Sequence, residues 1–276
     1  MRKFILIFAL ICVGITSPVL AGTVGNPIST DEPQGEGIFS LKQDKNSSIR
    51  GGLDFEFLLN RNLAANASTN LELTSGRSYM ARISYSLFDR IEPYFKLGIA
   101  QYDVKWTESG RDIEIESDEQ YAWALGLKTL ILNLESPKMK LIADGFYRMA
   151  ALEPSEGRVD GSLVSVDSAK SVFTITEWQI ALALATEIDI GGGPRGEFLG
   201  VSKMMPYIGA KYSDIGGRIR ATISDAVYYN PGIIESDNNY GCFVGCDFIG
   251  PNSVVLNVEG RFVDENAITV GLAAQF

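Results

Sequence analysis

The sequence predicts an all-β fold: a closed antiparallel transmembrane β-barrel of about ten strands, with eight and twelve strands as alternatives. Three observations lead to this prediction. Apolar and polar residues alternate along most of the 276-residue chain, which is the period of a strand with two different faces. The connections between the alternating segments are long and short in turn. Aromatic residues gather toward the segment ends on the apolar face, as in the girdles of outer-membrane barrels.

The N-terminal segment has the order of a secretory signal peptide. Arg2 and Lys3 precede the apolar run 4–13, and a β-branched and a small residue, Val19 and Ala21, lie three and one positions before Gly22. Because the run is shorter than the roughly 20 residues of a membrane helix, we expect cleavage and export rather than an anchor. The predicted domains are therefore a signal peptide (1–21), a periplasmic lead-in (22–47) and the barrel (48–276).

The composition excludes several classes of protein. The chain contains no histidine, which rules out Ser-His-Asp triads, Cys-His pairs and histidine-based metal sites. We therefore expect no enzyme, no cofactor and no metal site. The mean hydropathy is only +0.07 and the longest apolar run lies at the N-terminus, which excludes a helical membrane bundle. The cleaved chain keeps 22 basic and 34 acidic residues, so it is not expected to bind nucleic acid.

Two cysteines remain after cleavage. Cys242 and Cys246 lie four residues apart on one predicted strand, so their Cα atoms are about 13 Å apart, too far for a disulfide. Two further metal ligands are not found nearby. We interpret both cysteines as small apolar residues.

The first five alternating segments each have an apolar and a polar face. In the first segment, Leu53, Phe55 and Phe57 alternate with Asp54 and Glu56. In the next four, bulky residues again occupy every second position, and charged or small residues lie between them. The apolar faces of these four are Tyr79, Ala81, Ile83, Tyr85 and Leu87; Phe95, Leu97 and Ile99; Tyr121, Trp123, Leu125 and Leu127; and Leu141, Ala143, Gly145, Tyr147 and Met149.

The last five segments follow the same rule, and the final one is the clearest. Ile268, Val270 and Leu272 share one face, whereas Thr269 and Gly271 lie on the other. An additional hairpin within 216–229 is also compatible with the sequence, which leaves the strand count open. The other apolar faces are Trp178, Ile180, Leu182 and Leu184; Ile208, Ala210 and Tyr212; Tyr240, Cys242, Val244, Cys246 and Phe248; and Val254, Leu256, Val258, Gly260 and Phe262.

The lengths of the connections predict which strand ends lie together. Long connections are expected to form loops at one end of the barrel, and short ones to form tight turns at the other. The long connections are 60–75, 107–119, 152–171 and 223–238, and the short ones are 89–90, 135–137 and 250–252. The link 191–202 is intermediate, and only the brief connection 264–266 breaks the order.

The apolar face is predicted to point outward. A soluble lipocalin-like barrel would place these residues inside, and this orientation remains an alternative. The outward orientation is favoured because the polar face combines small residues with opposite charges, which suits a crowded interior, and because a sheet in hydrocarbon must close. The charges expected to set the polarity of the lumen are Lys96, Lys128, Asp144, Arg148, Lys211, Glu259 and Arg261.

The end of the chain resembles the last hairpin of small Gram-negative outer-membrane β-barrel proteins. The resemblance rests on residues 257–266 (NVEGRFVDEN) and 270–276 (VGLAAQF), and residues 93–98 (PYFKLG) and 206–214 (PYIGAKYSD) resemble other strands of that class. A C-terminal Phe is the signal for the barrel assembly machinery in this class. The resemblance therefore implies that Phe276 is an assembly signal, that the chain is in the outer membrane, and that its partners are the membrane lipid and this machinery.

A second, fainter resemblance concerns the chlamydial major outer-membrane porin. It rests on residues 24–27 (VGNP) and 88–90 (FDR). The present chain has fewer strands and cysteines than that porin.

Three remaining motifs have plain explanations. Residues 191–196 (GGGPRG) match G-x-G-x-x-G, but an alternating strand precedes them and Pro194 interrupts them, so we interpret a flexible turn. Asp54 and Glu56 lie on one polar face and are expected to join a lumenal charge network, whereas the pair 264–265 is expected to cap a turn. The acidic stretch 107–119 is expected to be a solvated loop.

The sequence thus predicts an outer-membrane barrel that is structural or forms a narrow polar pore for ions and small solutes. Barrels of about eight strands are filled by side chains and those of about sixteen hold water channels, so ten strands lined by charges imply a plugged lumen or a narrow passage. Known enzymatic barrels of this membrane use a histidine, which the chain lacks. The alternative is a surface-exposed binding or adhesion protein that uses loops 60–75, 152–171 and 223–238. A third hypothesis is a soluble periplasmic barrel with an apolar ligand.

Overall fold

The computed structural model of the chain describes residues 47–88, 90–134, 137–190, 201–223, 227–250 and 254–275. The predicted signal peptide, almost all of the lead-in, the 191–196 motif and Phe276 lie outside these residues. The described residues contain no helix that is long and apolar enough to cross a membrane.

The described chain is almost entirely β-structure, in one antiparallel sheet of fourteen strand segments. The all-β antiparallel class is therefore confirmed, but the number of segments exceeds the predicted ten or so. The segments are β1 (Ser47–Ala65), β2 (Thr69–Leu87), β3 (Ile91–Glu108), β4 (Arg111–Asp118), β5 (Gln120–Leu134), β6 (Met139–Val159), β7 (Ser162–Ser165), β8 (Val172–Thr186), β9 (Ile188–Asp189), β10 (Lys203–Ile223), β11 (Val227–Ser236), β12 (Tyr240–Ile249), β13 (Val254–Phe262) and β14 (Asn266–Gln275), with a short 3-10 helix η1 (Ser168–Lys170) after β7.

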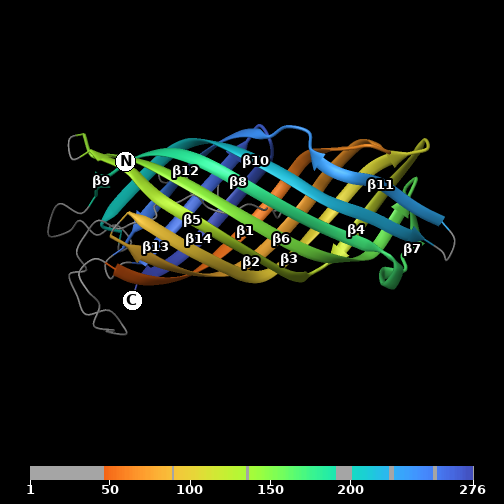
Figure 1. Cartoon of the computed structure of the whole chain (residues 1–276), viewed down its shortest axis with the longest axis horizontal. Helices are drawn as coiled ribbons and strands as arrows, with labels where there is room; N and C mark the ends of the chain where they lie inside the picture. Colours follow the sequence, from red (N-terminus) through yellow and green to blue (C-terminus); the bar gives the residue numbers. More distant parts are fainter. Residues whose placement is uncertain are drawn as a thin grey trace, which may run out of the picture.

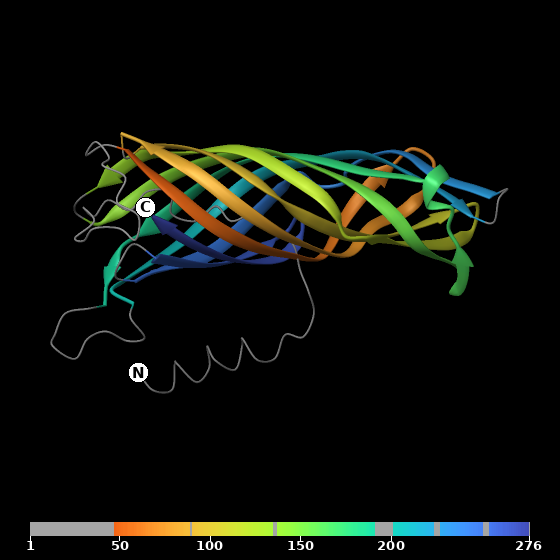
Figure 2. The ribbon, with the colours of Figure 1, turned by 90° about the horizontal axis from the view of Figure 1, so that it is seen from below.

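The sheet curls around a long axis and closes on itself (Figures 1 and 2). The closing contact joins β1 to β14, with Leu53 opposite Leu272. Among the described strands, ten pair in this ring, in the order β1, β2, β3, β5, β6, β8, β10, β12, β13, β14 and back to β1. We call this part of the molecule the lower section.

The extra segments β4, β7 and β11 lie at one end of the ring, and β9 lies at the other (Figure 1). β4 runs directly into β5, and β11 runs into β12 after a short break. The stretches that were predicted to be long loops are therefore largely extensions of the strands, and this prediction was wrong. Two of the hairpins end in tight turns, in which Ser109, Gly110, Asp160 and Gly161 all have positive φ, as type I′ turns require.

The ring narrows toward this end. The hairpin of β13 and β14 is short, and above it β11 pairs directly with β1, with Leu63 opposite Ser236. Eight of the described strands complete the ring there: β1, β2, β3, β4, β6, β8, β10 and β11. We call this part the outer section.

In the lower section the apolar residues point outward, as predicted. Phe55, Trp123 and Leu182 are 36–49% exposed, whereas Glu259 and Arg261 are 0% and 1% exposed. The orientation of a soluble barrel, with the apolar residues at the centre, is contradicted for this section.

The outer section has the opposite arrangement. Its interior is apolar, and Leu73, Val104 and Trp106 are fully buried there at 0% exposure. Its exterior is polar, since the side chains of Lys105 and Glu114 form an exposed ion pair. The same strands therefore exchange the chemistry of their two faces partway along their length.

Aromatic side chains occupy the level at which this exchange takes place. The ring of Trp178 on β8 lies 5.1 Å from that of Tyr212 on β10, which in turn lies 5.3 Å from Tyr240 on β12. Trp123 and Tyr147, on β5 and β6, are 5.7 Å apart. These contacts join neighbouring strands into an aromatic belt around much of the ring.

Candidate functional site

The interior of the lower section is the candidate site, because the predicted charges meet there. All seven predicted interior side chains are buried, with exposed fractions of 8% or less. They come from β3, β5, β6, β10 and β13: Lys96, Lys128, Asp144, Arg148, Lys211, Glu259 and Arg261. Strand alternation places them there, since each occupies the face opposite to a row of outward apolar residues.

The part of this interior that lies next to the outer section is organised around two arginines. We call the ion pairs around them the upper cluster. Arg148 on β6 pairs with Glu56 on β1 and lies 2.5 Å from a carboxylate oxygen of Glu177 on β8. Arg61 on β1 donates to the other carboxylate oxygen of Glu177 at 2.8 Å. The hydroxyl of Ser213 donates to Glu177 as well, at 2.6 Å. Glu177 thus links β1, β6 and β10 through the centre of the ring.

The connection between β13 and β14 folds into the same network. Asp264 Oδ2 lies 2.7 Å from Lys211 Nζ, and Glu265 pairs with both Lys211 and Arg61. Arg261 also donates to Glu265, at 3.0 Å. The two carboxylates were predicted to cap a turn, and they do lie in the turn between β13 and β14. Both residues are only 4% exposed, because three cations inside the ring attract the carboxylates inward.

A second branch of hydrogen bonds descends from Arg261 along β13. Arg261 Nε donates to Glu259 at 3.1 Å, and the Tyr207 hydroxyl donates to the same carboxylate at 2.8 Å. The Asn257 amide donates to Tyr207 at 2.8 Å and to Asp247. Polar groups therefore continue from the upper cluster toward the end of the lower section that carries β9.

The opposite wall carries a separate lower cluster. Asp54 lies 2.8 Å from Lys96 and 3.7 Å from Arg82. The hydroxyl of Tyr94 donates to Asp144 at 3.0 Å. The ammonium of Lys128 lies 5.7 Å from the centre of the Tyr94 ring, which is within the range of a cation–π contact.

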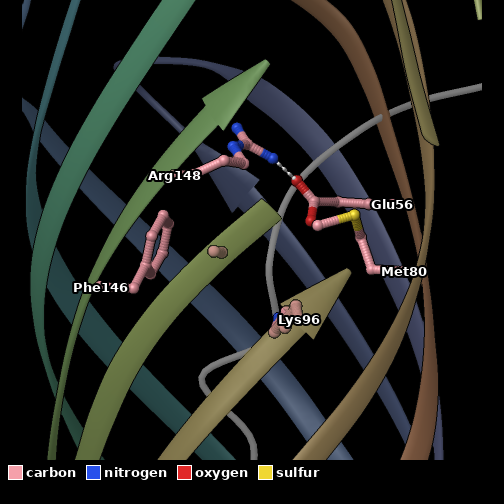
Figure 3. A pocket seen from close by; sticks show the side chains of 6 residues that line it. Glu56, Met80, Lys96, Phe146 and Arg148 are labelled. Atoms are coloured by element: carbon pink, nitrogen blue, oxygen red, sulfur yellow. Dashed lines mark hydrogen bonds and ion pairs between the residues drawn. The ribbon is translucent and has the colours of Figure 1, made fainter. Parts of the chain in front are cut away.

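A small cavity separates the two clusters. Glu56 and Arg148 of the upper cluster lie on one side and Lys96 of the lower cluster on another (Figure 3). The other lining residues are Met80, Ala124 and Phe146. The cavity has an accessible volume of about 10 Å³, roughly enough for one water molecule. Side chains thus occupy the interior at this level.

The charges of the interior nearly cancel. Among the described residues, nine buried carboxylates face eight buried cationic side chains. Removing ions from water is costly, and pairing with good geometry is what offsets that cost. The buried charges of this interior are therefore compensated almost one for one. The predicted network of Asp54 and Glu56 with basic residues is present, although the partners are divided between two clusters.

Several members of the network were not predicted. Arg61 lies in a stretch that was expected to be a loop, and nothing in its neighbourhood indicates that β1 continues through it. Glu177 alternates with Trp178 and Ile180, which does indicate an inward side chain, but its partners depend on which strands face each other across the ring. Tyr94 occupies an inward position that was expected to hold small or charged groups.

The end of the lower section that carries β9 has its own exposed ion pairs. Lys138 Nζ donates to Asp189 at 2.6 Å. This hydrogen bond lowers the pKa of the Asp189 carboxyl below its usual value and raises the pKa of Lys138. Lys203 lies 3.1 Å from Glu187 nearby, so the charges at this end are also paired.

No metal site is found in the described part of the chain, where no group of three or more Cys, Asp or Glu side chains is suitably placed. Cys242 and Cys246 are free thiols. Both lie on β12, on the outward face with Val244.

Comparisons with known proteins give a distant likeness in structure. No protein-family model matches the chain, and no curated protein matches its sequence. Among solved structures, the outer-membrane protease OmpT of Escherichia coli is 11% identical, with a TM-score of 0.42, covering 84% of this chain and 96% of OmpT. The translocator domain of the autotransporter NalP from Neisseria meningitidis is 9% identical, with a TM-score of 0.38, covering 86% and 90%. The transport unit of the autotransporter AIDA-I from Escherichia coli is 9% identical, with a TM-score of 0.39, covering 87% and 93%.

Proposed function

We propose that this chain is an integral outer-membrane β-barrel protein that is exported by a cleaved signal peptide and whose interior is closed by ion pairs. The observation that carries the proposal is the exchange of polarity along single strands. On β8, Leu182 points outward and Gln179 inward in the lower section, whereas Thr174 points outward and Phe173 inward in the outer section. A wall that is apolar outside over one band only matches a bilayer crossed by a barrel.

The soluble alternative is disfavoured by the same observation. A ligand-binding barrel in water would keep bulky apolar residues inside along its whole length. Here Ile83, Leu97 and Ile180 are each more than half exposed. Such a continuous apolar band would cause aggregation in water.

Between a structural role and a narrow polar pore, the geometry favours a barrel that is closed at rest. Buried ion pairs fill the lower section, and apolar side chains fill the outer section. An open channel would require hydrated polar groups along the whole axis. We therefore propose a structural barrel whose polar interior conducts only if part of the wall moves.

The test uses the full chain folded into lipid vesicles and then studied in a planar bilayer. We expect flotation with the vesicles, resistance to extraction by urea, a heat-dependent shift in gel migration, and no steady ion current. A chain that stays soluble without detergent would contradict the membrane proposal. A large steady conductance would contradict the closed state alone.

A second candidate is a surface-binding protein that acts through the outer section. The observation in its favour is that this section is built from paired strands with an ordered exterior. On that exterior, Arg158 lies 2.9 Å from Glu116, and Lys105 lies 3.0 Å from Glu114. Shortening the hairpin of β6 and β7 should then abolish binding to a target surface while leaving the barrel folded. Unchanged binding after that deletion would contradict this role.

A further inference from the structure

The wall of the ring has a step where ten strands become eight. β1 pairs with β14 as far as Asn60 opposite Asn266, and with β11 from Leu63 opposite Ser236. Arg61 and Asn62 lie between the two partners. The turn 263–265 approaches this place from below, because it joins β13 to β14. We call this region the step.

The polar interior ends at the step rather than at the outer end of the molecule. Above it, Trp106, Ile113 and Ile219 are fully buried in an apolar core. Such a mainly apolar core has few groups that could replace the water around an ion. At the step itself, Arg61 donates to the hydroxyls of Ser213 and Ser236 at 2.9 and 3.2 Å, so polar groups continue sideways to the wall.

The turn is held at the step by charge, and its backbone is strained. Asp264 and Glu265 are buried against Lys211, Arg61 and Arg261. Val263, beside them, has φ of +88° and is 70% exposed. A β-branched residue rarely adopts this conformation, and its persistence requires that its surroundings hold it there.

We propose that the turn 263–265 is a side gate for small anions. In the closed state its carboxylates neutralise the cations at the step. When the turn moves outward, Arg61, Lys211 and Arg261 line the opening, and the local charge becomes positive. This movement takes two carboxylate partners away from Lys211, whereas Arg61 and Arg261 keep Glu177 and Glu259. The excess of buried positive charge that results attracts anions from solution. This inference rests on the proposed insertion of the barrel into the outer membrane.

The test removes the two carboxylate charges without changing the size of the side chains. We expect the variant D264N/E265Q, folded into a planar bilayer, to show transient openings with an open probability roughly tenfold or more above that of the wild-type chain. In a gradient of potassium chloride, the reversal potential should indicate selectivity for chloride. The matched control is E114Q/E116Q, which removes two exposed carboxylates from the outer section and should be as silent as the wild type.

A reversible lock tests whether the current passes through the step. Asn60 and Asn266 are directly opposite each other, and their side chains are hydrogen bonded at 2.7 Å, so cysteines at both positions have suitable spacing for a disulfide. The lock N60C/N266C is placed in D264N/E265Q with C242A and C246A added, so that the native thiols do not interfere. Oxidation should abolish the openings, and a reducing agent should restore them.

The outcomes separate this proposal from the one on which it rests. Folded D264N/E265Q that stays silent, selects cations, or conducts through the oxidised lock would overturn the side gate. Failure of the wild-type chain to float with vesicles would overturn membrane insertion instead. If D264N/E265Q does not fold by heat-dependent gel migration, E265Q alone replaces it, with the same expectations and a smaller increase. Val263→Gly, which relieves the positive φ and keeps both carboxylates, should stay closed in the otherwise wild-type chain, and frequent openings of this variant would overturn the role assigned to the two charges.

Discussion

The guanidinium of Arg61 on β1 lies 2.8 Å from the carboxylate of Glu177 on β8, so one ion pair bridges two strands that are not neighbours in the ring. Both side chains are almost completely buried, at 1% exposure each. The pair therefore connects opposite parts of the wall through the interior. Its contribution to stability depends on both partners being present.

We expect Arg61→Met to destabilise the folded barrel by about 3–5 kcal/mol, because three carboxylates would lose a buried partner. The double variant R61M/E177M should lose less free energy of unfolding than the two single variants lose in sum, since it removes both partners of the ion pair together. The measurement is the free energy of unfolding by urea in lipid vesicles. Additive losses would contradict a direct coupling, and E114Q on the exposed wall serves as the control.

The outward band of β8 provides a test of membrane depth. Leu182→Arg should cost about 2–4 kcal/mol, because the proposed membrane insertion places this position against hydrocarbon. Thr174→Arg, on the same face of the same strand but in the outer section, should change the free energy of unfolding by less than about 0.5 kcal/mol. Equal effects at the two positions, measured in vesicles, would argue against the assigned boundary.

Packing of the interior against glycine gives a third prediction. A Cβ atom added at Gly245 would lie 2.3 Å from the ring of Tyr207, whereas one added at Gly216 would meet nothing closer than 3.6 Å. Gly245→Ala should therefore destabilise the barrel by about 1–3 kcal/mol, since it displaces the Tyr207 ring, whose hydroxyl donates to Glu259. Gly216→Ala is the matched control and should be close to neutral. A smaller effect at Gly245 than at Gly216 would contradict the packing described for this wall.

The apolar core of the outer section gives a fourth prediction. Trp106 is fully buried there, and its indole N–H donates to Glu108 at 3.0 Å. Trp106→Ala should cost about 3–5 kcal/mol and should raise hydrogen exchange mainly in β3, β4 and β11. The backbone amides of the lower section should keep their protection from hydrogen exchange. Loss of protection in both sections together would indicate that they do not unfold separately.

The C-terminal residue gives a prediction about assembly. Replacing Phe276 by Asp should reduce the amount of protein in the outer membrane, because the resemblance assigns Phe276 to recognition by the assembly machinery. Cell fractionation with detergent extraction measures this amount. Gln275→Asn, which changes the neighbouring residue conservatively, is the control. Normal insertion of the Asp variant would contradict the assembly role that the resemblance implies for Phe276.

Period-two alternation was enough to predict the inward charges. Lys96, Lys211 and Arg261 alternate with bulky residues, and each lies inside the ring. Their partners were not predicted, because an ion pair across the interior depends on strand order and on the narrowing of the ring. No local pattern around Arg61 or Glu265 contains that information.

The outer section was mistaken for loops for a different physical reason. Leu71 and Leu73 do alternate with Glu72 and Thr74, but the alternation is weaker there and many polar residues interrupt it. Polar exteriors and short tight turns are features that extended hairpins in water share with loops. Only the pairing of β1 with β2 and β11 distinguishes them.

Each long strand exchanges its apolar and polar faces at a defined residue, so the sequence itself sets the height of the apolar band on the wall. Moving the point of exchange by two residues on every strand would shift the apolar band by about 5 Å along the barrel axis, with the backbone unchanged. In the proposed membrane orientation, the depth of the barrel is thus set by the residues at which the two faces exchange, and a bilayer of another thickness would require changes only in the side chains at that level.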